Sequence, residues 1–382
     1  MTNPPDAAPP IPLTRPSTDE AELAAVAEVL RSGWLAGQGP RSAALEADVA
    51  ALTGRAHAVA LSNCTAGLHL ALGALGVGPG DEVLVADYSF PATAHAVLYR
   101  GGTPVFVDVR PDTGTIDPAL VEAAVTPRTK GIMAVDALGV PADYGPLSKI
   151  AERYGLFLVE DAACAAGGTY HGAPCGSFGD VAVFSLHARK GITSGEGGVL
   201  VTDDAGLAAA ARAAACFGMR SAYARQSAGT LDIPEFTALG YNYKLSDILA
   251  AIASVQLGKL GRLTARRREL AARYAGALAG IAGVTAPQVP ADREPTWQTY
   301  AVTVDPALDR DRLVMDLRGR GVGSHIGTFA LHAQPVYGAE PGRCPESARL
   351  FARHLALPMY ADLTDAEQDR VVEALAAAVA AQ

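Results

Sequence analysis

The chain has 382 residues, of which 49% are hydrophobic and 19% are charged. An apolar fraction of this size can bury a large core, so a mainly disordered chain is excluded. The net charge of −9, from 40 acidic and 31 basic residues, argues against a general nucleic-acid-binding or anionic-membrane surface.

The N-terminus is rich in proline, and we expect residues 1–12 to form a flexible arm. It lacks the basic and apolar regions of a signal peptide, and no apolar run in the chain reaches the ~18 residues of a membrane-spanning helix. The five cysteines form no CxxC pair, which argues against a disulfide framework and a metal cluster. We therefore expect a cytoplasmic protein with no metal and with neither nucleic acid nor membrane as partner.

Short β-rich runs alternate with helical segments from residue 57 onward, after two predicted helices over 19–31 and 42–53. The predicted strands are 57–61, 82–86, 104–107, 131–135, 156–160, 181–185 and 198–202. Continuous apolar strands that alternate with helices indicate an α/β fold with a mostly parallel, seven-stranded sheet covered on both faces. The last two runs are joined by a glycine-rich stretch without a helix, which predicts one antiparallel connection.

A long helix is predicted over 246–278, and the pattern changes after it. A strand over 299–304, a helix over 309–320, a strand over 321–325 and a final helix from Thr364 predict a smaller α/β unit. We therefore expect a large ligand-binding domain over 13–260 and a small C-terminal domain over 261–382.

Chemistry is expected at the C-terminal ends of the strands, where doubly wound sheets bind their ligands. Asp161 follows one predicted strand, and Lys190 lies shortly after another, with glycines behind it. The chain has only five lysines against 26 arginines, so a lysine at such a place is informative. A desolvated lysine can lose its proton and form an imine with an aldehyde.

Two other strand ends carry features of a binding site. Segment 61–68 (LSNCTAGL) turns into a helix through small polar residues, and the free N–H groups of a helix N-terminus bind anions. Segment 87–93 (DYSFPAT) places an aromatic residue where it can stack on a planar ring. Together these features require an aldehyde, a planar ring, a phosphate and a ring nitrogen that a carboxylate keeps protonated. Pyridoxal 5′-phosphate meets all four demands.

The chain resembles the fold-type I, pyridoxal-phosphate-dependent sugar aminotransferases of the DegT/DnrJ/StrS family from about Ser32 to its C-terminus. The resemblance is carried by GQGP (37–40), SNCTAGLHLAL (62–72), GPGDEVLVADYSFPATAHAVLYRGGTPVFVDV (78–109), PADY (141–144), VEDAACAAGGTYHGAPCGSFGD (159–180), FSLHARKGITSGEGG (184–198), GYNYKLSDILAAIASVQL (240–257) and LALPMY (355–360). It implies that Lys190 binds the cofactor covalently and moves the proton, and that Asp161 pairs with the pyridine nitrogen.

The resemblance also implies the other cofactor contacts. Phe90 takes the position of the aromatic residue that stacks on the ring, and Cys164 stands where Gln or His often meets the ring hydroxyl. The phosphate contacts that it implies are Cys64, Thr65, Ser185 and, from the neighbouring subunit, Asn242. A site completed by a second subunit implies a homodimer.

The substrate contacts are less constrained by the resemblance. His187 and Arg189 are candidates for holding the carboxylate of an amino donor, because Arg binds carboxylates through two hydrogen bonds. The further candidates are Trp34, His325 and His332. Gly327-Thr328 stands where the family often has His-Tyr near the sugar, so the substrate does not follow from the motifs.

The predicted function is transamination of a keto group on a nucleotide-linked sugar or a keto-cyclitol, with glutamate or glutamine as donor, in amino-sugar or antibiotic-sugar biosynthesis. A pyridoxal-phosphate-dependent sugar dehydratase or lyase is the alternative. Lys190 argues against the dehydratase branch that has histidine in place of the lysine. A non-catalytic regulator with the same fold is disfavoured by the joint presence of Asp161 and Lys190.

Overall fold

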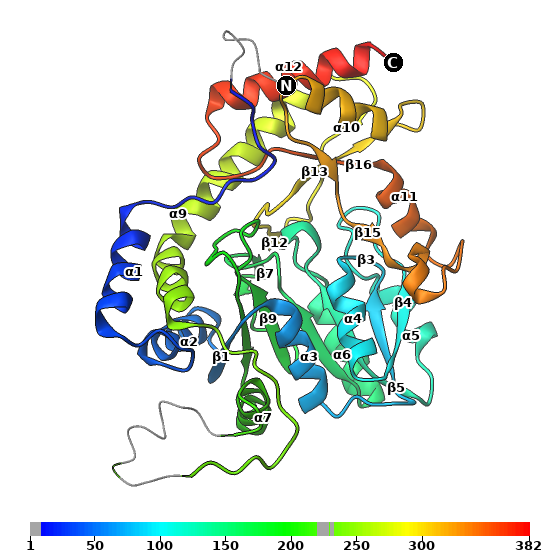
Figure 1. The fold of residues 1–382 in the computed structure, drawn as a ribbon. Helices are drawn as coiled ribbons and strands as arrows, with labels where there is room; N and C mark the ends of the chain where they lie inside the picture. Colours follow the sequence, from blue (N-terminus) through cyan, green and yellow to red (C-terminus); the bar gives the residue numbers. More distant parts are fainter. Residues whose placement is uncertain (1–8, 220–228, 230–232) are drawn as a thin grey trace.

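The computed structural model describes residues 9–219, 229 and 233–382. Figure 1 shows a large sheet flanked by helices, with a smaller layer of helices and strands above it and the long helix α9 running between the two. None of the helices in these ranges is long and apolar enough to cross a membrane.

The large sheet has seven strands, as the sequence predicts. In spatial order they are β1 (His57–Leu61), β10 (Gly198–Thr202), β9 (Val181–Ser185), β6 (Phe157–Asp161), β5 (Thr129–Val135), β2 (Glu82–Ala86) and β4 (Thr103–Val107). Strand β10 pairs antiparallel with both neighbours, and the other pairs are parallel. The predicted antiparallel connection is therefore confirmed at β9 and β10, which no helix separates.

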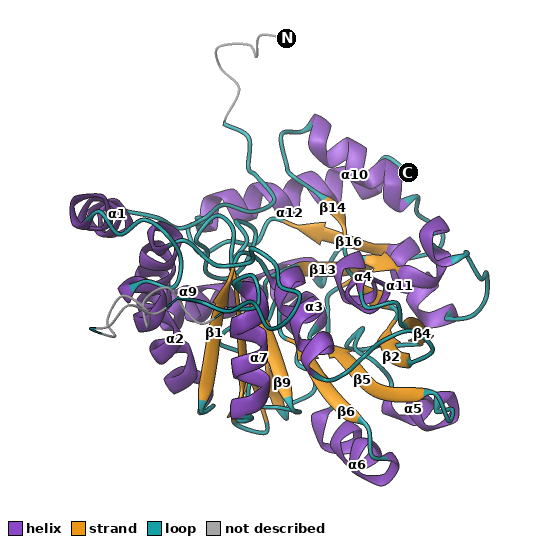
Figure 2. Ribbon diagram, turned by 60° about the horizontal axis from the view of Figure 1, so that its bottom comes forward, coloured by secondary structure: helices purple, strands orange, loops and turns teal. Residues whose placement is uncertain are grey.

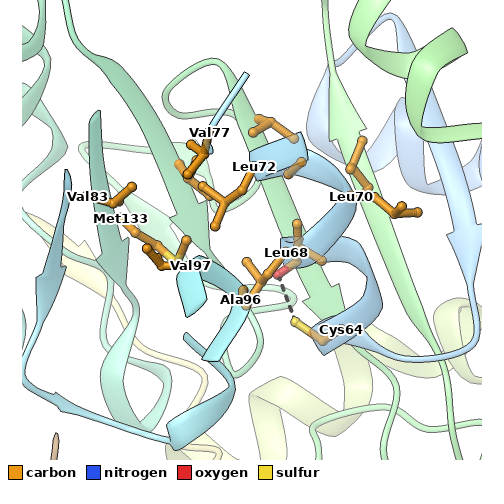
Figure 3. Close-up of a cluster of buried hydrophobic side chains, with 14 of the residues drawn as sticks. Cys64, Leu68, Leu70, Leu72, Val77, Val83, Ala96, Val97 and Met133 are labelled. Carbon is orange, nitrogen blue, oxygen red and sulfur yellow. Dashed lines mark hydrogen bonds between the residues drawn. The ribbon is translucent and has the colours of Figure 1, made fainter. Parts of the chain in front are cut away.

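Helices cover both faces of this sheet (Figure 2). They are α2 (Pro40–Thr53), α3 (Cys64–Ala74), α4 (Pro91–Tyr99), α5 (Pro118–Ala124), α6 (Tyr144–Tyr154), α7 (Ala205–Ala215) and α9 (Asp247–Leu278), and α1 (Glu20–Ser32) packs on the outside of α9. Successive side chains of a strand point to opposite faces. Val59 and Leu61 accordingly pack in the cluster formed with α3 and α7, whereas Ala58 and Ala60 pack in the cluster formed with α2 and α9. Figure 3 shows part of the first cluster.

The smaller layer is built on a four-stranded sheet in the order β11 (Val284–Thr285), β13 (Tyr300–Val304), β16 (His354–Leu357) and β14 (His325–Ile326). Helices α10 (Arg310–Gly319), α11 (Pro345–Arg353) and α12 (Asp365–Ala380) accompany it, and short 3₁₀ turns lie between β14 and α11 at Leu331–Ala333 and Pro335–Tyr337. A further 3₁₀ turn, Ala137–Gly139, follows β5 of the large sheet. The strand predicted over 321–325 is wrong in its bounds: only His325 of that run is in β14.

Two short sheets connect the layers. Strand β15 (Phe329–Ala330) pairs with β3 (Tyr88–Ser89), and β12 (Arg293–Glu294) pairs with β7 (Thr169–Tyr170), which also pairs with β8 (Ala173–Pro174). The first of these pairings lays the segment after β14 across the C-terminal edge of the large sheet, where the sequence predicts chemistry.

The predicted N-terminal arm differs from the structure at its end. Residues 1–8 lie outside the described residues, but Ile11 is only 1% exposed and belongs to the apolar cluster of the smaller layer. Its backbone N–H donates to the Gly321 carbonyl over 2.8 Å. The prediction of a flexible arm is therefore corrected at Ile11, because burial of an isoleucine side chain lowers its free energy relative to water.

Candidate active site

A cavity of about 430 Å³ lies between the C-terminal ends of the large-sheet strands and the smaller layer. Of the predicted site residues, it is lined by Cys64, Thr65, Phe90, Asp161, Cys164, Ser185, His187, Arg189, Lys190 and His325. The smaller layer contributes Gln298, Gly327, Thr328 and Phe329, so the cavity is closed by segments far apart in the sequence.

Asp161 ends β6 and is 4% exposed. Its Oδ2 accepts a hydrogen bond from the Thr93 hydroxyl over 2.8 Å, and its Oδ1 accepts one from the Ala163 N–H over 3.2 Å. Burial raises the pKa of the Asp161 carboxyl, while Thr93, the Ala163 N–H and the charge of Lys190 act against that rise. The Thr93 hydroxyl and the Ala163 N–H thus fix the direction of the carboxyl group, and the Cys64 thiol lies 4.0 Å from its Oδ1.

Lys190 lies in the loop after β9, and its Nζ donates to the Cys164 Sγ over 3.1 Å. Burial acts to lower the pKa of the Lys190 amine, but Cys164, Cys64 and Asp161 together outweigh it, and the pKa is raised. Without a cofactor the amine is therefore held as an ammonium group that faces Asp161 and two thiols.

The first turn of α3 has the geometry of an anion site. The Asn63 Oδ1 accepts a hydrogen bond from the Ala66 N–H over 2.8 Å and so caps the helix. Within the described part of the chain, the N–H groups of Cys64 and Thr65 have no acceptor, and they lie at the positive end of the helix dipole. A Cβ atom on Gly198 would approach the Cys64 nitrogen to 2.6 Å, so a glycine is needed for β10 to pass this turn.

Two more predicted residues lie around the same space. Phe90 is 56% exposed at the start of α4, and its ring meets that of Phe329 edge-on at 6.2 Å. The Ser185 hydroxyl is buried and accepts a hydrogen bond from the His187 N–H over 3.3 Å. An exposed ring and a hydroxyl at the C-terminal ends of two different strands suit a ligand that has a planar ring and an anionic group.

The predicted substrate residues divide into two groups. His187, Arg189 and His325 line the cavity, and burial together with Arg318 and Arg189 lowers the pKa of His325. His187 Nε2 lies 3.7 Å from the Glu196 carboxylate. These groups form the polar rim on the side that faces the smaller layer.

His332 does not line the cavity, which corrects the expectation for this residue. It is 3% exposed, and its Nδ1 meets the Asp87 Oδ2 at 2.6 Å while its backbone N–H donates to Oδ1 of the same carboxylate over 2.7 Å. A buried carboxylate needs such donors, and this pairing turns the imidazole away from the ligand space.

Trp34 and Asn242 also lie outside this cavity. Trp34 packs beside Gly39, where an added Cβ would meet the indole nitrogen at 2.0 Å. Asn242 is exposed, and its Oδ1 accepts a hydrogen bond from Lys244. In a single chain neither side chain reaches the ligand space.

Thr93 and Gln298 are two polar cavity residues that the sequence interpretation missed. The signal for Thr93 was present, because it lies three residues after Phe90 and so faces the same way on the first turn of α4. For Gln298 no local signal existed, since it comes from a loop of the smaller layer.

The site fits pyridoxal phosphate by its chemistry. It offers a lysine amine, a buried carboxyl group held by hydrogen-bond donors, an exposed aromatic ring, and helix N–H groups that find no acceptor in the described ranges, all around one cavity. Such a site on a mostly parallel α/β fold defines a fold-type I aminotransferase.

Residues 16–376 match the DegT/DnrJ/EryC1/StrS aminotransferase family, and the chain belongs to this family. It is similar to the aminotransferase TlmJ from Streptoalloteichus hindustanus, with 38% identity over 97% of this chain and 99% of that chain and a TM-score of 0.90. It is also similar to DesI, solved in the presence of its TDP-sugar product, with 36% identity over 98% of this chain and 94% of that chain and a TM-score of 0.89.

A third similar structure is the PLP-form of Spr1654 from Streptococcus pneumoniae, a putative sugar aminotransferase by its description. It is 28% identical over 97% of this chain and 99% of that chain, with a TM-score of 0.90. The fold class and the family predicted from the sequence are thereby confirmed.

Proposed function

We propose that this sugar aminotransferase uses pyridoxal 5′-phosphate to move an amino group from glutamate or glutamine to a keto group of a nucleotide-linked sugar. The observation that carries the proposal is the meeting of Lys190, Asp161 and the first turn of α3 in one cavity. The bound cofactor supplies an electron sink for the carbon that exchanges its proton. The PLP-form of Spr1654 supports this choice of cofactor.

The role of each site residue follows from its position in the cavity. The Asp161 carboxylate holds a proton on the ring nitrogen, with Thr93 and the Ala163 N–H fixing its direction. Lys190 Nζ takes and returns the proton that moves during amino transfer. The N–H groups of Cys64 and Thr65 and the Ser185 hydroxyl bind the phosphate.

The nucleotide-linked sugar is proposed because DesI, a similar chain, was solved with a TDP-sugar product. The cavity rim offers Arg189, His187 and His325 for the donor carboxylate and the sugar hydroxyls. A keto-cyclitol has the same carbonyl chemistry without the nucleotide, and a place in amino-sugar or antibiotic-sugar biosynthesis follows from either substrate. A cytoplasmic location is part of the same proposal.

We further propose a homodimer. Asn242 is exposed and lies away from the cavity of its own chain, at the end of a segment with exposed apolar side chains. Ile233, Phe236 and Leu239 are 75%, 64% and 83% exposed, respectively, which is an unfavourable arrangement in water unless a second copy covers them. The boundary that we propose between the two domains, at residue 260, falls inside α9, and this helix joins the two layers.

The experiment for the reaction compares the wild type with Lys190→Ala. The wild type should exchange its cofactor with glutamate or glutamine and aminate keto-sugar nucleotides, as product mass shows, whereas Lys190→Ala should lose both activity and the cofactor adduct that borohydride traps. Lys149→Ala, an exposed lysine on α6, is the matched control and should behave like the wild type. Loss of water from the sugar without any amino donor would instead establish the dehydratase alternative.

The experiment for the dimer mixes two inactive variants. Lys190→Ala and Asn242→Ala each damage one side of a shared site, so mixing them should restore part of the activity if the site uses both chains. No restoration, together with a monomeric mass in light scattering, would refute the shared site.

A further inference from the structure

The loop that carries Lys190 is held on both sides of that residue. The Gln298 Nε2 donates to the Arg189 carbonyl over 3.0 Å, and the Arg267 Nη1 donates to the Gly191 carbonyl over 3.0 Å. These carbonyls belong to the residues immediately before and after Lys190. The backbone of the lysine is therefore fixed by two side chains that come from outside the loop.

Arg267, which donates to the Gly191 carbonyl, is a buried cation. It lies on α9, is 5% exposed, and among the described residues it forms no ion pair, while its Nε has no acceptor. Burial lowers the pKa of the Arg267 guanidinium to about 10, with the charge of Asp362 acting against this. The group is still charged at neutral pH.

A buried charge without a carboxylate partner is costly, and an apolar side chain of similar length would avoid that cost. A role in core packing therefore does not account for an arginine here. What a methionine could not do is donate to the Gly191 carbonyl. The guanidinium also lies against the loop backbone, because a Cβ atom on Gly191 would come within 3.3 Å of its Nη1.

The same helix holds the loop at a second point. The Thr193 N–H donates to the Gln256 Oε1 over 3.4 Å, and Gln256 lies about three turns before Arg267 on α9. The Thr193 hydroxyl in turn donates to the Leu186 carbonyl over 2.8 Å, which closes the loop on itself. The rigid helix thus spans the part of the loop that follows Lys190.

We propose that Arg267 is a positioning residue that holds the Lys190 backbone, and so keeps Nζ in reach of the reacting carbon, by donating to the Gly191 carbonyl. Its relevance to catalysis rests on the proposed function. Its effect on the loop is independent of that function and can be measured in the protein without cofactor.

The experiment uses Arg267→Met with Arg266→Met as matched control. Arg266 is the preceding residue on α9, but it forms surface ion pairs with Glu269 and Asp365. In Arg267→Met protein without cofactor, backbone amides of residues 187–197 should exchange with deuterium about tenfold faster, with the rest of the molecule unchanged. With cofactor and substrates, kcat should fall about 10- to 100-fold while both KM values stay within about twofold, because misplacement of a reacting group costs rate rather than binding.

Arg266→Met should leave the exchange, kcat and KM as in the wild type. Wild-type exchange of residues 187–197 in a folded Arg267→Met protein would overturn the proposal, as would an unchanged kcat in an active enzyme. If the wild type proves inactive on keto sugars, the exchange result still decides the positioning role while the proposed function fails.

If Arg267→Met does not fold, Arg267→Lys replaces it. Lysine keeps the buried charge but has a shorter reach and a single terminal donor group, so residues 187–197 should again exchange faster and kcat should fall. Wild-type exchange in folded Arg267→Lys would overturn the proposal.

Discussion

Lys190 and Cys164 meet inside the cavity, where the Lys190 Nζ donates a hydrogen bond to the Cys164 Sγ over 3.1 Å. Burial alone would lower the pKa of the amine, and Cys164 contributes most to the opposing rise. The residue that stands where the family often has Gln or His therefore acts on the lysine itself, which the sequence interpretation did not foresee.

The first prediction concerns Cys164→Ala. Removing the thiol removes an influence that raises the pKa of Lys190, so more of the amine is neutral at a given pH. Because only the neutral amine attacks the cofactor aldehyde, the rate at which pyridoxal phosphate attaches to the protein without cofactor should reach its midpoint at a lower pH. Stopped-flow absorbance over a pH series measures this rate. Cys216→Ala, which removes a buried thiol outside the cavity, should keep the wild-type profile; an identical profile for Cys164→Ala would contradict the prediction.

The second prediction concerns Thr93→Val, a change that keeps the side-chain shape. It removes a hydroxyl that donates to the Asp161 Oδ2 and lowers the pKa of that carboxyl. The pKa of Asp161 should rise, so the acid side of the pH profile should move to higher pH. The single-turnover rate with the amino donor should fall about 10- to 100-fold, the value of a hydrogen bond to a charged group.

Thr113→Val provides the control for this measurement. Thr113 is buried and shares a hydrogen bond with Thr115, but it lies outside the cavity. It should change stability without moving the pH profile. A Thr93→Val enzyme whose acid limb coincides with that of the wild type would show that the threonine does not tune Asp161.

Much of the large sheet could be predicted because its strands are apolar on both faces. Runs such as His57–Leu61 and Val181–Ser185 have the predicted bounds, since a strand buried on both sides leaves a continuous apolar signal. Asp161 and Lys190 could be placed for the same reason: the ends of such strands are visible, and the topology brings them to one edge.

The contacts between distant segments could not be predicted. Thr93 meets Asp161 across 68 residues, and His332 meets Asp87 across 245 residues. Local patterns carry no information on such pairs, so the sequence predicts His332 at the ligand space although a buried carboxylate holds it. The short strand β14 was misplaced because a two-residue strand gives too little alternation to fix its bounds.

The third prediction concerns Gly327, which lines the cavity where the family often has a larger residue. A Cβ atom there would meet the Tyr88 hydroxyl at 2.3 Å and the His354 Cβ at 3.0 Å. Gly327→Ala should therefore lower the free energy of unfolding by about 1–3 kcal/mol, because the Tyr88 hydroxyl must move. This hydroxyl accepts a hydrogen bond from the Thr328 N–H. A Cβ atom on Gly276 of α9 meets no described residue within 4 Å, so Gly276→Ala should raise stability by about 0.5–1 kcal/mol. Urea unfolding compares the two, and equal stability of Gly327→Ala and the wild type would refute the close contact.

The last prediction concerns the pH dependence of stability at His354. Burial, reinforced by the charges of Arg349 and Arg310, lowers the pKa of this imidazole from 6.5 to about 3, and its Nδ1 meets the Tyr88 hydroxyl at 2.8 Å. Between these two pKa values the unfolded chain binds one proton more than the folded chain. The stability that His354 contributes is therefore present above pH 6.5 and is lost as the pH falls toward 3.

His354→Gln, whose amide oxygen can still accept from Tyr88, removes this titration. Between pH 6.5 and pH 4 the wild type should lose about 3 kcal/mol more unfolding free energy than the variant. Urea titrations at both pH values measure the difference, which cancels the effects of the acidic residues common to both proteins, and parallel losses in the two proteins would show that His354 is already protonated in the folded state.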